Sequence, residues 1–238
     1  PCFFKNRMEI VSNSPEKIVL KIDVSYSLAN AIRRSVEETL TLAIDEIEFF
    51  KNDSALYDEY LAHRLGLVPL KMDGKMGPKT SVELKLKKSG PCTVYSGDLI
   101  GSVKAAYKNM PLTILEKGQE LELVATAKLS NGLEHAKYVP GLANYRNILE
   151  VKSSSQIDGI IQESKGAIKA EKKGNKWLCD LNETTIDEIR ALDKDSINET
   201  NELLFFVESF GQMDAKTILI KAVECLEDNL EEFTKKIK

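Results

Sequence analysis

Hydrophobic and polar residues alternate with a period of two over residues 7–25, on either side of the turn-forming stretch SNSPE. This pattern predicts two strands. The predicted buried face of the second strand consists of Ile18, Leu20, Ile22 and Val24. Similar alternation or short apolar runs predict strands over 43–50, 81–90, 92–99 and 202–211, and a strand pair around the turn signal SNG within 121–139.

Helical spacing replaces the strand pattern after residue 26. A helix of about four turns, with Ser27 as its N-cap, is predicted from apolar residues at every fourth position. These residues are Leu28, Ile32, Val36 and Leu40. A shorter helix is predicted to end near Gly66. Strands and helices together predict an α+β protein with a β-rich middle.

The longest predicted helix follows Asp214, which can cap it. Its apolar residues are spaced alternately by four and three positions, and they are Leu219, Val223, Leu226, Leu230, Phe233 and Ile237. This heptad-like spacing makes a narrow apolar seam on a helix of roughly 35 Å. Such a seam needs a surface to lie against. Either the helix's own domain supplies that surface or, as the more specific interpretation, a partner helix does.

Composition and charge argue against several classes of protein. The formal net charge is −4 and the pI about 5.5, so direct binding of nucleic acid is not expected. Residues 150–202 are polar and carry a net charge of −4 by themselves, as an appended or inserted element with a thin core would. No apolar run approaches the ~20 residues of a membrane span, and the first residues lack the apolar core of a signal peptide, so we expect a cytoplasmic protein without a membrane partner.

Residues that carry catalytic or metal chemistry are scarce. The four cysteines are scattered and form no C-x-x-C pair, which predicts no stoichiometric zinc or iron–sulfur cluster and no cofactor. Glycine-rich phosphate loops and the G-x-S-x-G nucleophile motif are missing, and His63 and His135 are the only histidines. An enzyme with an unusual site and a redox or metal carrier built on residues 150–202 remain as alternatives, but no motif favours either.

Five stretches of the sequence point to one family. LANAIRRSVEETLTLAID (28–45) and NDSALYDEYLAHRLGLVPL (52–70) resemble the assembly-platform subunits of multi-subunit RNA polymerase. This family comprises the archaeal D-type subunits, the third-largest subunit of eukaryotic RNA polymerase II and the bacterial alpha N-terminal domain. The resemblance continues, in the family's order, at YSGDL (95–99), GQELELVATAKLSNGLEHAKYVPG (118–141) and FFVESFG (205–211).

The resemblance implies a split architecture. Residues 1–45 and 203–238 would form a discontinuous dimerisation domain of a sheet and two helices, and residues 46–148 an inserted β-rich domain. Residues 149–202 would be a small polar insert at the position of a ferredoxin-like element. Because this insert contains only Cys179, the resemblance implies a degenerate element without cluster cysteines.

The resemblance also implies partners and their binding residues. The helices of the split domain would pair with a small L-like subunit through Leu28, Ile32, Val36, Leu219, Val223, Leu226, Leu230, Phe233 and Ile237. The large catalytic subunits, with small N-like and P-like subunits, would bind elsewhere, and the residues facing the large subunits would be Arg33, Arg34, His63, Arg64, His135 and Lys137. The alternative for the arginine pair is a solvated helix face, and for the histidines a role in packing. In either case the chain would have no catalytic residues of its own.

Overall fold

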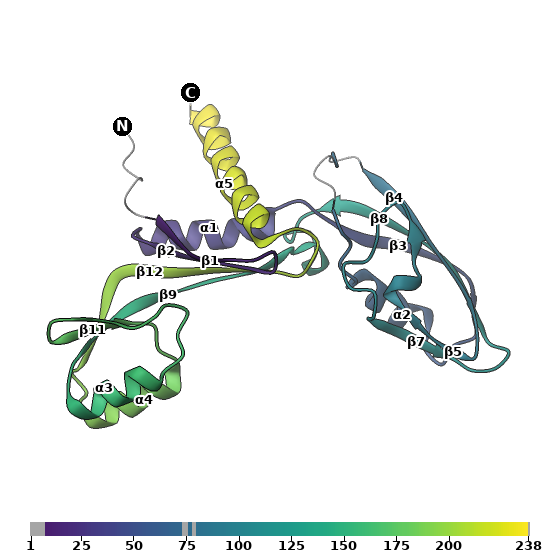
Figure 1. The fold of residues 1–238 in the computed structure, drawn as a ribbon. Coiled ribbons are helices and arrows are strands. Elements are labelled where there is room, and N and C mark those ends of the chain that lie inside the picture. The colour runs from purple at the N-terminus through teal and green to yellow at the C-terminus, as the bar shows by residue number, and fades with distance from the viewer. Residues whose placement is uncertain (1–7, 73–75, 78–79, 238) are drawn as a thin grey trace.

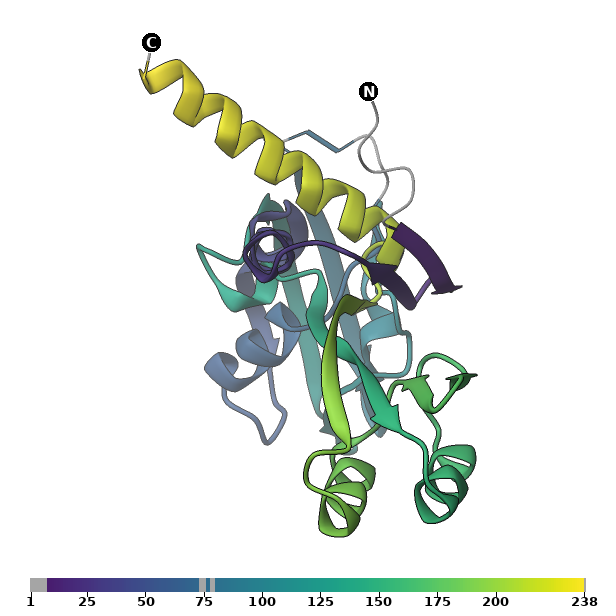
Figure 2. The ribbon, with the colours of Figure 1, turned by 90° about the vertical axis from the view of Figure 1, so that its left-hand side faces the viewer.

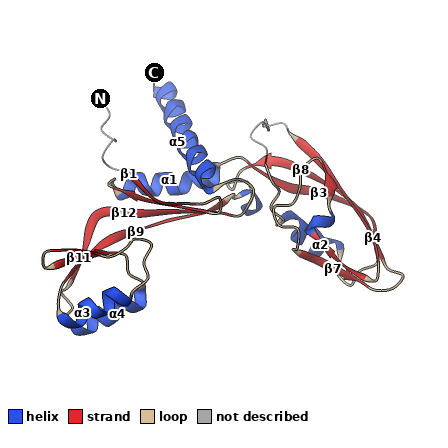
Figure 3. Cartoon of the chain, viewed as in Figure 1, coloured by secondary structure: helices blue, strands red, loops and turns tan. Residues whose placement is uncertain are grey.

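Two antiparallel sheets form the framework of the chain, and each carries its own helices (Figure 1; Figure 3). The computed structural model describes residues 8–72, 76–77 and 80–237. The six-stranded sheet has the order β1 (Met8–Asn13), β2 (Lys17–Ile22), β12 (Ile197–Ser209), β9 (Gly141–Lys152), β11 (Lys176–Cys179) and β10 (Glu171–Lys173). The four-stranded sheet has the order β3 (Thr41–Asn52), β8 (Glu120–Ser130), β4 (Ser81–Ser89) and β6 (Ile100–Gly101). The α+β class predicted from the sequence is confirmed.

The helices are distributed over three places. Helices α1 (Tyr26–Glu38) and α5 (Ala215–Ile237) lie on one face of the six-stranded sheet. Helix α2 (Asp58–Gly66) and the two-stranded sheet of β5 (Cys92–Tyr95) and β7 (Pro111–Leu115) accompany the four-stranded sheet, together with the 3-10 turns η1 (Ser96–Asp98) and η2 (Ala136–Tyr138). Helices α3 (Ser155–Glu163) and α4 (Glu183–Leu192) form a lobe at the β10–β11 end of the six-stranded sheet.

Strand β2 is buried on both of its faces, although its alternation predicted only one. Of the predicted buried face, Ile18, Leu20 and Ile22 pack under α1 and α5, whereas Val24 lies beyond the end of the strand and is half-buried. Val19 on the opposite face is also buried, in a second cluster with Ile148, Leu204 and Phe206. The second face is closed partly by long cationic side chains, because the Arg146 guanidinium lies 4.8 Å from the centre of the Phe206 ring.

Helix α1 begins and ends earlier than its apolar spacing predicted. The side chain of Ser25, not of Ser27, accepts a hydrogen bond from the Leu28 amide at 3.3 Å and caps the helix. The helix ends at Glu38, so Leu40 lies outside it and is 39% exposed. Its buried residues are Ala29, Ser35 and Val36, since small side chains let the helix approach the sheet.

The strand pair predicted around SNG does not exist. Strand β8 ends at Ser130 and pairs with β3 and β4, whereas β9 begins at Gly141 in the other sheet. The SNG stretch instead belongs to the connection between the two sheets, where the Gly132 amide donates a hydrogen bond of 2.6 Å to the carbonyl of Glu37 in α1. Sheet membership therefore changes near residues 40 and 140 rather than at the boundaries of the predicted 46–148 insert.

The polar segment 149–202 contains a packed core, although its sequence predicted only a thin one. Eight residues form it: Leu149, Val151, Ile157, Ile161, Trp177, Cys179, Leu181 and Ile189. Asp158 fastens α3 to the β10–β11 hairpin, because it accepts hydrogen bonds from Trp177 Nε1 and Lys172 Nζ, each at 2.7 Å. These bonds, with one from Ser153, lower the pKa of Asp158 from 3.8 to about 2.

We expect this lobe to lose stability in acid. The folded pKa of Asp158 is depressed, so its carboxylate stabilises the lobe fully above about pH 4, and that contribution disappears as the pH falls to about 2. Asp158→Asn should destabilise the lobe at pH 7 and flatten this pH dependence. The fluorescence of Trp177, the only tryptophan of the chain, reports the unfolding. Asp187→Asn on the exposed side of α4 is the control, and equal behaviour of both variants would contradict the assignment.

Candidate subunit interface

The C-terminal half of α5 extends beyond the rest of the chain (Figure 2). Only Ala215, Ile218 and Ala222 of this helix are buried, and all three lie in its first half. The first half of α5 crosses α1. The polar contact between the two helices that lies furthest along α5 is a hydrogen bond of 2.5 Å from the Asn229 amide to the Glu38 carboxylate. From residue 230 onward every described side chain is exposed.

The seam predicted on α5 follows this division. Leu219, Val223 and Leu226 are half-buried, whereas Leu230, Phe233 and Ile237 are 58%, 64% and 69% exposed. The stripe that packs on the helix's own domain is made by Ala215, Ile218 and Ala222, and Leu219 of the seam also packs against this core. The C-terminal part of the seam, made by Leu230, Phe233 and Ile237, is therefore an apolar surface that the described part of the chain leaves open. Beside it Ile220 is 48% exposed, a residue that heptad spacing alone did not select.

The three predicted partner residues of α1 are less accessible. Leu28 and Ile32 are half-buried, and Ile32 packs against the core under the helix. Val36 is 1% exposed, so it supports the helix from below and cannot touch a partner in this conformation. Four-residue spacing cannot separate these roles, because the stripe of a helix includes both its buried centre and its half-exposed borders.

The two arginines of α1 differ in their surroundings. Arg33 donates to Asn30 Oδ1 through Nε and Nη2, at 3.1 and 3.0 Å, which fixes its guanidinium along the helix. Arg34 is exposed and has no hydrogen-bond or ion-pair partner among the residues that the structure describes. Neither side chain contributes to the apolar core of the domain.

Lys137 holds the connection between the sheets and is not free for a partner. Its ammonium lies 2.6 Å from Asp45, which also accepts hydrogen bonds from Lys128 and, at 2.8 Å, from Tyr138. Burial alone would raise the pKa of Asp45, but these three bonds outweigh it and hold that pKa well below its usual range. Burial and the bond to Asp45 raise the pKa of Tyr138. Sequence reasoning missed Asp45, whose partners are nearly a hundred positions away.

The two histidines are both exposed but differ in their hydrogen bonds. His135 Nδ1 accepts a hydrogen bond of 3.1 Å from the Lys137 amide, so it caps η2 as a packing residue would. His63 lies in the last turn of α2, and its side chain has no hydrogen bond, ion pair or ring contact with another described residue. Arg64, its neighbour, donates from Nη2 to the carbonyl of Pro111 in β7 at 2.5 Å. The C-terminal end of α2 also adjoins Lys137. A Cβ atom added to Gly66 would lie 3.8 Å from Lys137 Cδ.

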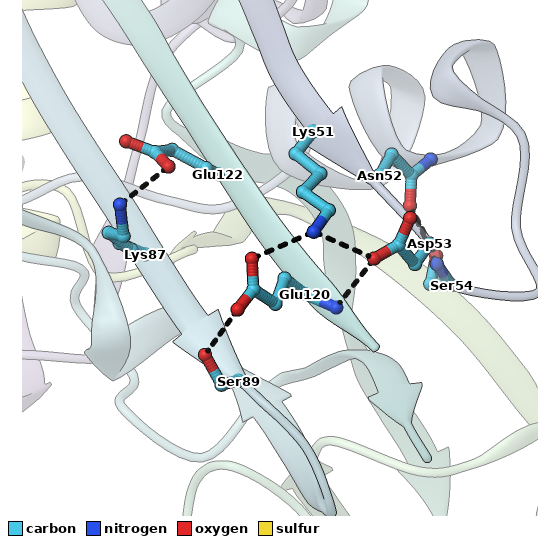
Figure 4. Close-up of polar contacts among 8 residues, drawn as sticks. All are labelled: Lys51, Asn52, Asp53, Ser54, Lys87, Ser89, Glu120 and Glu122. Carbon is cyan, nitrogen blue, oxygen red and sulfur yellow. Dashed lines mark hydrogen bonds and ion pairs between the residues drawn. The ribbon is translucent and has the colours of Figure 1, made fainter. Parts of the chain in front are cut away.

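A ladder of charged residues covers the outer face of the four-stranded sheet (Figure 4). Lys51 lies 2.9 Å from Glu120 and 3.5 Å from Asp53, and Lys87 lies 2.7 Å from Glu122. The bond with Glu120 raises the pKa of Lys51 and lowers that of Glu120. All of these groups are exposed and paired with opposite charges, as in a solvated sheet face, and none has the burial that prepares a group for catalysis.

Metal ligands do not converge within 8–72, 76–77 and 80–237, where no three His, Cys, Asp or Glu residues form a group that could hold an ion. Cys179 is buried, and burial, with the nearby charge of Asp180, raises the pKa of its thiol to about 12. In the same ranges no helix is long and apolar enough to cross a membrane.

Comparison with known proteins gives consistent results. Residues 43–154 match the family described as the RNA polymerase Rpb3/RpoA insert domain. The chain is 34% identical over 245 residues to DNA-directed RNA polymerase subunit Rpo3 of Methanothermobacter thermautotrophicus, covering 91% of this chain and 93% of the relative. It is 30% identical over 264 residues to Rpo3 of Methanobrevibacter smithii, covering 95% and 96%. The match to Rpo3 of Pyrococcus horikoshii, 39% over 165 residues, spans only 64% of either chain.

Proposed function

The chain belongs to the Rpo3 family of archaeal DNA-directed RNA polymerase subunits, and from this membership we propose that it is the assembly platform of its polymerase. In this proposal residues 1–45 and 203–238 form the dimerisation domain, which pairs with a small L-like subunit. The pair then docks the large catalytic subunits and the small N-like and P-like subunits in the cytoplasm. The chain contributes no catalytic residue, cofactor or metal site to transcription.

The open seam of α5 is the observation that supports this proposal most. Near its end the helix carries Leu230, Phe233 and Ile237, each more than half exposed. The exposure of this apolar stripe to water is unfavourable, and a partner that covered it would lower the free energy. Around the same residues the helix has ion pairs within itself, such as Lys236 with Glu232 at 2.6 Å, which keep the remaining faces polar. One apolar stripe on an otherwise charged helix is typical of a helix–helix interface.

Stepwise reconstitution tests the proposal. The chain is produced alone and with the small L-like subunit of the same polymerase, and the large subunits are then added. We expect the chain alone to self-associate or precipitate, a soluble one-to-one pair with the small subunit, and recruitment of the large subunits by that pair only. A chain that remains a clean monomer in the presence of the small subunit would refute the proposal.

The arginines of α1 make a second test possible within the same experiment. Replacement of Arg33 and Arg34 by alanine should cost less than ~1 kcal/mol of stability, because both lie outside the core and alanine favours helix. If they bind carboxylates of a large subunit, the doubly substituted chain should still pair with the small subunit yet recruit the large ones at least about tenfold more weakly. Undiminished recruitment would identify the pair as a solvated face.

A further inference from the structure

A cavity in the lobe of α3, α4 and the β10–β11 hairpin has no role in the proposed function. Its volume is about 480 Å³, which is within the range of sites that bind small molecules. The C-terminal end of α3, the connecting segment 164–170 and residues of β11 and its following loop line it. Both ribbon views show the lobe remote from α5, so a ligand here and a partner on α5 do not compete (Figure 1; Figure 2).

Asp180 lines this cavity with a carboxylate that the chain satisfies only in part. The residue is 2% exposed. Its Oδ2 accepts hydrogen bonds from Arg146 Nη2 at 2.6 Å and from the Ala167 amide at 2.7 Å. Its Oδ1 is buried as well, but it accepts no hydrogen bond from any described residue. Because a buried oxygen without a donor is costly, Oδ1 is suited to an N–H or O–H group that comes from outside the chain.

Two lysines determine the charge of the cavity. Lys165 and Lys169 both line it, both are exposed, and neither side chain has a hydrogen bond or ion pair with another described residue. The third charged residue of the lining is Asp180, whose charge the Arg146 guanidinium compensates. The two ammonium groups are therefore available to an anion. A phosphate monoester carries close to two negative charges at neutral pH and matches them better than a carboxylate.

The remaining wall of the cavity is apolar and partly aromatic. Ile161 and Trp177 are 1% and 8% exposed, and Ile168 and Ala170 beside them are half-buried. Trp177 Nε1 already donates to Asp158, so the indole offers a ligand its ring and not a donor. Such a wall favours a flat apolar group, for example a heteroaromatic base.

We propose that this cavity binds a nucleoside monophosphate whose base carries an amino group, with adenosine monophosphate (AMP) as the representative. The phosphate lies between Lys165 and Lys169, the base lies against Trp177, and the amino group donates to Asp180 Oδ1. Binding is reversible and involves no covalent step. The site belongs to the lobe alone, so this inference goes beyond the assembly role and does not depend on it.

Titration of the full chain with AMP and with inosine monophosphate (IMP) tests the proposal. The chain is used in its pair with the small subunit, or alone if it does not pair, and calorimetry measures the affinity while Trp177 fluorescence serves as a second readout. We expect AMP to bind with a dissociation constant below about 1 mM. IMP has an oxygen in place of the amino group, so it should bind at least about tenfold more weakly, because that oxygen and Oδ1 are both acceptors.

Asp180→Asn should reverse this preference. The donors of Arg146 and Ala167 keep the side-chain oxygen at the Oδ2 position, so the amide nitrogen takes the place of Oδ1 and becomes a donor. The variant should bind AMP at least about tenfold more weakly than wild type and IMP more tightly than wild type. A purely structural role of Asp180 would instead change both affinities alike.

The lysines have a matched control in the same lobe. Lys165→Ala and Lys169→Ala should each weaken AMP and IMP by the same factor of about five or more, because both ligands carry the phosphate. Lys194→Ala removes an exposed lysine that does not line the cavity, and it should bind both ligands like wild type.

Each remaining outcome would refute the site. These are no binding of AMP below about 1 mM, as expected if only water reaches Oδ1, equal affinities of wild type for AMP and IMP, or equal losses in Lys169→Ala and Lys194→Ala. If Asp180→Asn is unstable, purine riboside monophosphate, which lacks the amino group of AMP, is titrated into wild type and should bind at least about tenfold more weakly than AMP. A failure to pair with the small subunit would refute the proposed function and not this site.

Discussion

Leu230→Asp or Phe233→Asp should abolish pairing with the small subunit while the chain keeps its own fold. Both side chains are more than half exposed in the described structure, so neither substitution disturbs the core. In the pair, an aspartate at either position would be buried in an apolar seam without a partner. That burial costs about 3 kcal/mol or more, which corresponds to at least a hundredfold loss of affinity.

The measurement is the affinity of each purified variant for the small subunit, together with its melting temperature. Leu192→Asp is a suitable control, because Leu192 is a leucine of α4 with 49% exposure that lies on a different part of the chain. We expect this control to pair like wild type. A seam variant that retained wild-type affinity would show that α5 meets its partner through another face, such as the one that carries Ile220.

Phe205→Ala should cause the largest loss of stability of any single substitution considered in the six-stranded sheet and the helices α1 and α5. Phe205 is 1% exposed, and its ring stacks on Tyr145 with the ring centres 6.3 Å apart. It lies in the cluster that joins β2, β9 and β12 to α1 and α5. Removal of a buried phenylalanine leaves a cavity and costs about 3–5 kcal/mol.

Urea denaturation followed by circular dichroism measures this effect. Phe210→Ala removes the same atoms from a side chain that is 47% exposed, and it should cost less than ~1 kcal/mol. Because α5 rests on the cluster around Phe205, the Phe205→Ala chain should also pair less tightly with the small subunit at temperatures near its unfolding. Equal urea midpoints for the two variants would contradict the assignment of Phe205 to the core.

The local elements were predictable from the sequence because their signals are local. The period of the apolar residues located α1, α5 and most strands, and turn and stop signals located α2. The seam of α5 was found from its spacing alone. Strand partners depend on residues far apart in the chain, so the SNG stretch predicted a hairpin where β8 and β9 part into different sheets. Local turn chemistry gave no sign that Gly132 bonds to α1.

The same distinction explains which of the predicted partner residues are exposed in the structure and which are not. The spacing placed Leu230 and Phe233 on one apolar seam but left open whether the helix's own domain covers it, and the structure leaves both side chains more than half exposed. The burial of Val36 and the pairing of Lys137 with Asp45 depend on tertiary contacts that no spacing contains. The core of the lobe was missed for a related reason. Trp177 and Cys179 on β11 meet Ile157 and Ile161 on α3 only after the chain has folded back on itself.

The order of strands in the six-stranded sheet also determines when, during synthesis, the sheet that carries α1 and α5 can form. Strand β2 pairs with β12, which follows both inserted segments in the chain, whereas β3, β4 and β8 find one another within 41–130. On the ribosome the strands of the four-stranded sheet can therefore pair with one another before β12, the partner strand of β2, has been synthesised. A nascent chain interrupted within either inserted segment would lack both β12 and α5, which come later in the chain. Translation itself would thus restrict the small subunit to chains whose inserted units have already been made.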